Sequence, residues 1–267
     1  VVEFAQRLMP VQLDSDGGAL LKHKIQDLGV QVHTEKATTE IVAGQDARLR
    51  MNFSDDSHLE TDLIVFSAGI RPQDALARAC GLKVGERGGI IINDQCTTSD
   101  PNIHAIGECA LWSERIFGLV APGYTMARTM ASVLNGDSDA AFTGADMSTK
   151  LKLLGVDVGS IGDAHGQTAG AKSIRFNDEQ AGHYRRMVIS EDGKKLLGAI
   201  LVGDNSHYDT LLQYALNEIE LPQQPESLIL PESEGGSPML GPDSLPDTAG
   251  ICSCHNVSKG DICRVIN

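Results

Sequence analysis

Apolar residues in the first part of the chain form short continuous runs and one stretch at helical spacing, separated by glycine and polar residues. The helical spacing in 16–28 predicts an amphipathic helix with Asp16 as its N-cap and Gly29 as its stop. Four consecutive apolar residues at 63–66 are typical of a central parallel strand that ends in a loop. Further strands are expected at 1–4, 30–34, 39–43, 48–53, 90–92 and 104–106, and further helices at 74–80 and 122–134.

The pattern changes from about residue 145, where strands follow one another and a single helix comes last. The expected strands are 150–154, 156–161, 171–176, 184–189 and 196–202, and the expected helix is 206–218. This order indicates a separate α+β domain. Residues 221–250 then hold six of the chain's ten prolines, and no Lys or Arg lies between Leu201 and Ser258. Such a composition predicts an extended, solvated linker, with a helix expected from Ser258 onward.

Composition narrows the class of protein. The net charge of -14 argues against nucleic acid or an anionic membrane surface as the main partner, since both attract basic patches. The chain has no apolar run long enough to span a bilayer. Six scattered cysteines are too sparse for a secreted disulfide scaffold, so a reducing cytoplasm is expected. Because the chain starts at Val1 inside an apolar run and stops inside an expected helix, we expect an internal piece of a longer polypeptide.

The most distinctive segment is 98–109, an apolar strand followed by Gly107 and Glu108. Taken alone, it could be a strand followed by a glycine turn. The segment resembles the second FAD fingerprint of the flavoprotein reductases with two dinucleotide-binding domains, with His104 where these proteins usually have an aromatic residue. The resemblance implies that Gly107 lets the backbone approach the flavin chain closely and that the Glu108 carboxylate accepts a hydrogen bond from a ribitol hydroxyl.

Two further segments resemble parts of the same family. Pro122, Gly123 and Tyr124 start a helix whose N-terminus would face the flavin ring, where its exposed N–H groups favour negative charge. The alternative is an ordinary helix that begins with proline. Ala68 and Gly69 lie in a loop that resembles the AxGxxP loop closing the NAD domain, where small residues let the nicotinamide lie flat. The alternative there is a plain strand-to-helix turn.

Glu3 ends the first apolar run. An acid at the end of the second strand of a Rossmann unit accepts hydrogen bonds from the adenosine ribose 2′-OH of NAD and repels the 2′-phosphate of NADP. The alternative is a solvated strand-end glutamate. No side chain is assigned a catalytic role, and Arg185, Arg186 and His165 are interpreted as solvated polar residues of a strand edge and a loop.

Cys252 and Cys254 form a C-x-C motif behind the proline-rich segment. The motif resembles the start of the bacterioferritin-associated-ferredoxin type of [2Fe-2S] module, in which a second cysteine pair follows some tens of residues later. Thiolates are strong ligands for iron. Two loop cysteines or half of a zinc site are the alternatives.

The resemblance extends along essentially the whole chain and implies an α/β flavoprotein with partial Rossmann-type domains, a small α+β C-terminal domain and the start of a [2Fe-2S] module. The expected domains are a partial NAD domain at 1–81 and the second half of an FAD domain at 82–143, followed by the α+β domain at 144–220. The linker is expected at 221–249 and the truncated module at 250–267.

Within the family, 108–112 and 150–158 resemble the branch of large subunits of NADH-dependent assimilatory nitrite reductases. This resemblance implies electron flow from NADH through FAD to iron–sulfur centres, with [4Fe-4S] and sirohaem in the full-length protein reducing nitrite to ammonium. It also implies a small subunit as a further partner. A related reductase serving nitrate reductase, rubredoxin or oxygen is the first alternative. A regulatory module that kept the fold without flavin is the second.

Overall fold

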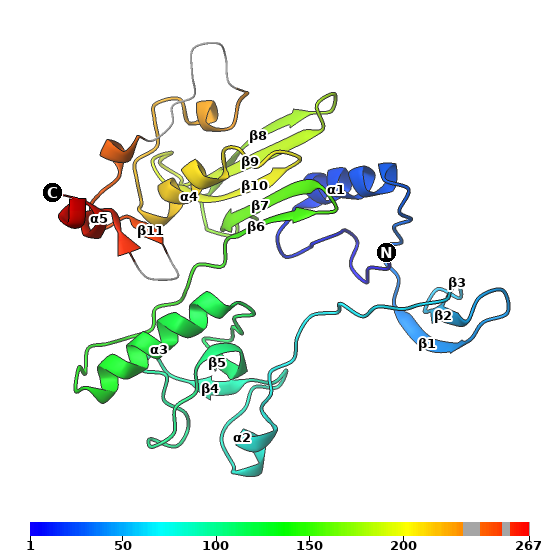
Figure 1. The fold of residues 1–267 in the computed structure, drawn as a ribbon, viewed down its shortest axis with the longest axis horizontal. Helices are drawn as coiled ribbons and strands as arrows, with labels where there is room; N and C mark the ends of the chain where they lie inside the picture. The colour runs from blue at the N-terminus through cyan, green and yellow to red at the C-terminus, as the bar shows by residue number, and fades with distance from the viewer. Residues whose placement is uncertain (232–240, 253–256, 267) are drawn as a thin grey trace. The chain divides into compact units, whose positions relative to one another are not determined.

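Two compact units make up residues 1–231, 241–252 and 257–266, which this computed structural model describes (Figure 1). The first unit contains Val1–Val65, Ser148–Ile251 and the C-terminal segment from Val257. The second unit contains Phe66–Met147 and, among the described residues, also Cys252. Both ends of the described chain therefore belong to the first unit, and the second unit is formed mainly by the middle of the chain. The domain boundaries expected from the sequence stay a prediction.

A five-stranded antiparallel sheet is the centre of the first unit. Its strand order is β6-β7-β10-β9-β8, with β7, β10 and β9 in the interior. All five strands were expected from the sequence, to within about two residues. They are β6 (Thr149–Leu153), β7 (Val156–Gly162), β8 (Lys172–Asp178), β9 (His183–Ile189) and β10 (Leu196–Val202).

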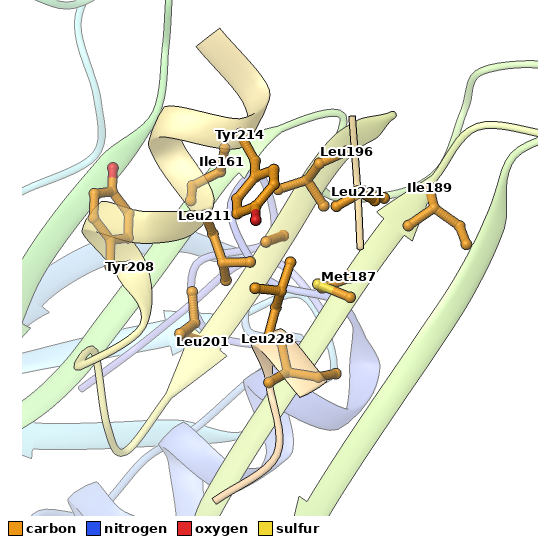
Figure 2. Packing of buried hydrophobic residues seen from close by; sticks show 12 residues of the cluster. Ile161, Met187, Ile189, Leu196, Leu201, Tyr208, Leu211, Tyr214, Leu221 and Leu228 are labelled. Atoms are coloured by element: carbon orange, nitrogen blue, oxygen red, sulfur yellow. The ribbon is translucent and has the colours of Figure 1, made fainter. Parts of the chain in front are cut away.

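One face of this sheet is covered by α4 (Tyr208–Leu216) and by the segment that follows it. Leu211 of α4 is fully buried, and Tyr208 and Tyr214 are nearly so. Figure 2 shows these side chains pointing toward those of β7, β9 and β10. The buried members of this cluster are Ile161, Met187, Ile189, Leu196, Ala199, Leu201, Tyr208, Leu211, Tyr214, Leu221, Leu228 and Ile229.

The opposite face is covered by α1 (Ser15–Asp27), which matches the helix expected at 16–28. The N-cap is Asp14 rather than Asp16, because the Asp14 carboxylate accepts the Gly17 N–H at 3.0 Å. Glycine in a helix costs about 1 kcal/mol relative to alanine. Close packing explains its presence here, since a Cβ on Gly17 would lie 3.3 Å from a methyl of Val202.

Coverage on both faces buries every residue of β9 from Tyr184 to Ile189, and it overturns the solvated-edge interpretation of Arg185 and Arg186. Arg185 faces the α4 side, where it pairs with Asp204 and donates to the Ile229 carbonyl at 2.8 Å. Arg186 faces the α1 side and pairs with Asp14 at 2.9 Å. Burial raises the pKa of Asp204, but hydrogen bonds, including that from Arg185, lower it below its ordinary value.

The first residues of the proline-rich stretch are also buried, which differs from the solvated linker that composition predicts. Leu221, Leu228 and Ile229 are 7%, 3% and 1% exposed, and a short 3₁₀ turn, η2 (Pro225–Leu228), presents two of them to the sheet. The composition of this segment does not reveal the burial, because only three apolar side chains anchor a stretch that is otherwise polar and rich in proline.

The N-terminal segment of the first unit contains a short parallel pairing and a separate meander. Val2 bridges His33, so the expected strands at 1–4 and 30–34 lie side by side, although each is only a single bridge. The meander pairs β1 (Thr38–Ala43), β2 (Leu49–Phe53) and β3 (His58–Thr61) in sequence order. Of these three, β3 was not expected.

The second unit contains α2 (Ala75–Ala79), β4 (Ile90–Ile92), η1 (Gly107–Cys109), β5 (Ala110–Trp112) and α3 (Val120–Leu134). The strands β4 and β5 are parallel. Phe117 and Met126 are among the buried residues of its core. Trp112 meets the Phe142 ring edge-on at 5.0 Å and donates from its indole N–H to Asp94 at 2.8 Å.

The prediction of a strand at 63–66 is wrong. This segment has no regular structure, and Leu63, Val65 and Phe66 are 74%, 79% and 71% exposed. A parallel strand needs hydrogen-bonding neighbours, and no strand in the described part of the chain pairs with it. The strand expected at 104–106 is likewise reduced to one bridge between Thr97 and His104.

Near the C-terminus, η3 (Pro242–Ser244) precedes the two-stranded pairing of β11 (Gly250–Cys252) with β12 (Val257–Ser258), and α5 (Lys259–Ile266) follows. Ser258 and Asp261 exchange hydrogen bonds across the first turn of α5, as the predicted N-cap implies. Among the described helices, none combines the length and the apolar character needed to cross a bilayer.

We expect Arg185→Met to lower the free energy of unfolding by about 3 kcal/mol, because it leaves the partly buried Asp204 carboxylate without its cation. The methionine keeps most of the packing of the arginine stem. The measurement is the midpoint of urea unfolding followed by circular dichroism.

The matched control is Arg175→Met on the neighbouring strand β8. Arg175 and its partner Asp16 are each 52% exposed, so its loss should change the free energy of unfolding by about 0.5 kcal/mol or less. Equal losses in the two variants would contradict a special role for the buried pair.

Candidate functional site

A tight turn at Gly107 joins the extended residue Ile106 to η1. Gly107 has a φ of +77°, a conformation that glycine adopts without strain. No atom lies within 4 Å of the position that a Cβ on Gly107 would take. The turn therefore leaves open space on that side of the backbone, next to Glu108.

The first turn of α3 packs directly on this turn. A Cβ on Gly123 would lie 3.2 Å from the Gly107 Cα, so any larger residue would have to push the two backbones apart by a few tenths of an ångström. The Gly107 N–H also points at the Met126 sulfur, 3.3 Å away. The structure thus brings together the two segments, 107–108 and 122–124, that the sequence assigned to one ligand.

The N-terminus of α3 has no side-chain cap, since its N-cap residue is Leu119. The helix starts two residues earlier than expected, and Pro122 is buried inside its first turn. Uncapped N–H groups and the positive end of the helix dipole favour an anionic or polarised acceptor. Tyr124, in the second turn of the helix, is 58% exposed.

The Glu108 side chain is exposed, and no described residue hydrogen-bonds its carboxylate. A carboxylate can accept several hydrogen bonds from hydroxyl groups. Glu108 is therefore free to accept hydrogen bonds from a polyol lying along the Gly107 turn.

The loop with Ala68 and Gly69 lies in the same unit. Gly69 has a φ of +84°, and the next residue, Ile70, reaches toward Gly118, where an added Cβ would lie 3.4 Å from the isoleucine Cδ1. Because residue 118 lies two positions before the first residue of α3, the structure places this loop beside the chain that enters the helix. Ala68 itself is exposed.

Glu3 lies in the first unit, at the end of the short parallel pairing with His33. Its carboxylate accepts the Ala5 N–H at 2.8 Å, and the Glu3 N–H donates to the His33 oxygen at 2.8 Å. The side chain is half-buried. Glu3 is thus a strand-end acid as expected, with one carboxylate oxygen already bonded to backbone.

The C-x-C motif is only partly covered by the structure. The Cys252 backbone ends β11, and Cys254 lies outside the described residues. Elsewhere in the described segments, no group of three or more His, Cys, Asp or Glu side chains is placed to bind a metal ion. Iron ligation by Cys252 and Cys254 stays a prediction.

The profile of the pyridine nucleotide-disulphide oxidoreductase family matches residues 1–135 of the 267. The chain belongs to this family. Residues 148–219 match a second profile, described as the rubredoxin NAD+ reductase C-terminal domain. Its limits enclose the five-stranded sheet and α4.

Curated relatives are similar along the entire chain. The nitrite reductase [NAD(P)H] large subunit of Klebsiella oxytoca is 61% identical over 268 residues, which cover 100% of this chain and 28% of that protein. The nitrite reductase (NADH) large subunit of Escherichia coli K12 is 60% identical, with 100% and 32% covered. The chain therefore spans about a third or less of these relatives.

Solved structures show the same fold. A ferredoxin reductase from Rhodopseudomonas palustris has a TM-score of 0.67 and 25% identity, covering 85% of this chain and 55% of that one. An FAD-dependent pyridine nucleotide-disulphide oxidoreductase from Desulfovibrio vulgaris has a TM-score of 0.59 and 28% identity, covering 76% and 52%. The predicted α/β flavoprotein fold class is confirmed.

Met126 is a site residue that the sequence analysis missed. Its side chain is fully buried and its sulfur is the acceptor for the Gly107 N–H. The available signal was its position three residues after Gly123, which places both on one face of α3.

We expect Gly123→Ala to lower the free energy of unfolding of the second unit by about 1–3 kcal/mol, because its Cβ would press on the Gly107 backbone. The measurement is chemical denaturation followed by near-ultraviolet circular dichroism of the Trp112, Phe117 and Phe142 cluster. Gly118→Ala is the control in the same unit, since a Cβ there would make only ordinary van der Waals contacts with Ile70, at 3.4 and 4.0 Å. An unaffected Gly123→Ala variant would contradict the close approach.

Proposed function

We propose that this chain carries parts of the flavin and nicotinamide sites of an NADH-dependent oxidoreductase of the nitrite reductase type. The observation that carries the proposal is the approach of Gly123 to Gly107, which puts the first turn of α3 beside Glu108. Identities of 60% and 61% to two nitrite reductase large subunits support the choice of branch.

The residues present fit FAD. The glycine turn offers open space next to an exposed carboxylate, and the uncapped start of α3 is nearby. In this proposal the Glu108 carboxylate accepts a hydrogen bond from a ribitol hydroxyl, and Gly107 allows the backbone to approach the flavin chain closely. The segment of Pro122, Gly123 and Tyr124 faces the flavin ring. The chemistry that bound FAD supplies is acceptance of two electrons as hydride from NADH and release of single electrons to an iron–sulfur centre.

For NADH, we assign the adenosine ribose to Glu3 and the nicotinamide side to Ala68 and Gly69. Small residues in that loop exclude little space, so a flat ring could stack within the contact distance that hydride transfer needs. The Glu3 carboxylate accepts hydrogen bonds from the ribose hydroxyls, and its negative charge repels the additional 2′-phosphate of NADPH.

Cys252 and Cys254 are proposed as two of four thiolate ligands of a [2Fe-2S] cluster. The support is their spacing and the flavoprotein family that precedes them along the chain. In the whole protein we propose that electrons continue to a [4Fe-4S] cluster and sirohaem, where nitrite becomes ammonium, with a small subunit as partner and the cytoplasm as location.

A second candidate is electron delivery to another acceptor. The assimilatory nitrate reductase electron transfer subunit of Bacillus subtilis is 37% identical over 98% of this chain. Its name describes a different terminal acceptor behind a similar sequence.

The intact protein decides between these proposals. Purified protein should be yellow, contain FAD and oxidise NADH with nitrite as acceptor, releasing ammonium. Oxidation of NADH that is supported by nitrate reductase but never by nitrite would favour the second candidate. Absence of flavin would reject both.

We expect Glu108→Ala to weaken FAD retention by about 1–3 kcal/mol, because a ribitol hydroxyl loses its acceptor. The measurement is the flavin remaining bound after stepwise dilution and filtration. Glu86→Ala is the matched control, an exposed acid in the same unit. Equal flavin retention in the two variants would remove Glu108 from the site.

We expect Glu3→Ala to reduce the preference for NADH over NADPH, because the acid no longer repels the 2′-phosphate. The measurement is the ratio of kcat/KM for the two nucleotides. Glu40→Ala on β1 is the control, an exposed acid of the same unit. A ratio that stays at the unaltered value would show that Glu3 does not contact the ribose.

A further inference from the structure

Residues 5–14 form the loop that connects Glu3 to α1, and the loop is tied to itself by Arg7. The Arg7 Nε–H donates to the Leu13 carbonyl at 2.8 Å, and a second guanidinium nitrogen donates to that of Pro10 at 3.3 Å. Although Arg7 lies close to Glu3 in sequence, its guanidinium donates these hydrogen bonds to carbonyls of the loop. The loop therefore has a defined shape.

The C-terminal domain adds a second set of bonds to the same loop. His165, between β7 and β8, contacts the Val11 carbonyl at 2.8 Å through Nε2, so this nitrogen carries the proton. From β9, the Tyr184 hydroxyl and the Arg186 guanidinium donate to one oxygen of Asp14 at 2.6 and 2.9 Å. Residues more than 150 positions away in sequence thus hold the loop.

These bonds are buried where they meet Asp14. Asp14 is 8% exposed and Tyr184 is 2% exposed. Burial raises the pKa of the Asp14 carboxyl, but hydrogen bonds from Tyr184, Arg186 and the α1 backbone lower it below its ordinary value. The carboxylate is therefore charged and fully engaged, and removing one donor leaves part of a buried charge unsatisfied.

Packing closes the remaining space around the loop. A Cβ on Gly18 would lie 2.9 Å from the Arg7 Cβ and 3.0 Å from its Cδ. The first turn of α1 thus presses on the arginine stem from one side, while the same turn packs against the sheet. Loop, helix and sheet form one packed body.

The start of the loop is bonded to the nucleotide-selecting acid. The Ala5 N–H donates to Glu3 Oε1 at 2.8 Å, and the Ala5 carbonyl accepts the Glu35 N–H at 3.0 Å. The direction of the Glu3 carboxylate therefore depends on where residue 5 is held.

We propose that the C-terminal domain positions the NADH-selecting carboxylate, with His165, Tyr184 and Arg186 acting on Glu3 through the loop 5–14. The inference rests on the proposed role of Glu3. It assigns to the C-terminal sheet a part in nucleotide selection in addition to its packing role. These three side chains are positioning residues, since none of them contacts Glu3 itself.

The test uses the intact, flavin-loaded protein. Tyr184→Phe and His165→Ala each remove one hydrogen bond to the loop, and each should raise KM for NADH by about threefold to tenfold. The kcat at saturating NADH should stay unchanged, because the hydride-transfer geometry is not altered. The preference for NADH over NADPH should fall by a similar factor.

Two further variants separate positioning from general weakening. Tyr214→Phe makes the same chemical change on the opposite face of the sheet, where Tyr214 is 6% exposed, and it should alter neither KM nor preference. His165→Gln keeps an N–H donor and should restore most of the affinity. Since His165 is only half-buried, the His165 pair stays informative even if Tyr184→Phe fails to fold.

Unchanged KM and preference in His165→Ala and Tyr184→Phe, in a protein whose preference responds to Glu3→Ala, would overturn the inference and leave the proposed function standing. Equal effects of Tyr184→Phe and Tyr214→Phe would also overturn it. Failure of the unaltered protein to oxidise NADH would instead reject the proposed function itself.

Discussion

Burial of the three inner strands of the sheet, β7, β10 and β9, on both faces is the constraint on which most of the first unit depends. It forces Arg185 and Arg186, adjacent on β9, to find acids on opposite sides. Arg185 pairs with Asp204 just before α4 and also donates to the Ile229 carbonyl in the segment after α4, whereas Arg186 pairs with Asp14 at the start of α1. Because a buried cation without its partner is costly, these bonds fix the chain on both sides of α4 and the distant start of α1. The sheet acts as the common support for both.

The second unit depends on a different constraint, the backbone contact between Gly107 and Gly123. Two glycines let a turn and a helix start meet without side chains between them. That contact leaves an acid, Glu108, and the uncapped N-terminus of α3 around open space. In the proposed function this arrangement holds FAD, since dinucleotides bind where glycine lets the backbone approach them closely.

Much of this could be predicted from the sequence. Alternating runs located all five strands of the sheet, and Gly107, Glu108 and 122–124 marked two segments that the structure brings together. Predictions failed where partners were distant in sequence. The apolar run at 63–66 does not form a strand, because no neighbouring strand pairs with it in the described part of the chain. Arg186 lies in the core because Asp14, at the start of α1, supplies its counter-charge. Local pattern does not reveal such partners, nor did it reveal that Leu228 and Ile229 anchor the start of the proline-rich stretch.

The only tryptophan of the chain lies four residues after Glu108, edge-on to Phe142 and hydrogen-bonded to Asp94. Indole emits light at wavelengths that flavins absorb, so a bound flavin near this ring would drain its excited state by energy transfer. Under the proposed function, the fluorescence of Trp112 therefore reports flavin binding. Quenched emission corresponds to bound flavin, and stronger emission corresponds to its release.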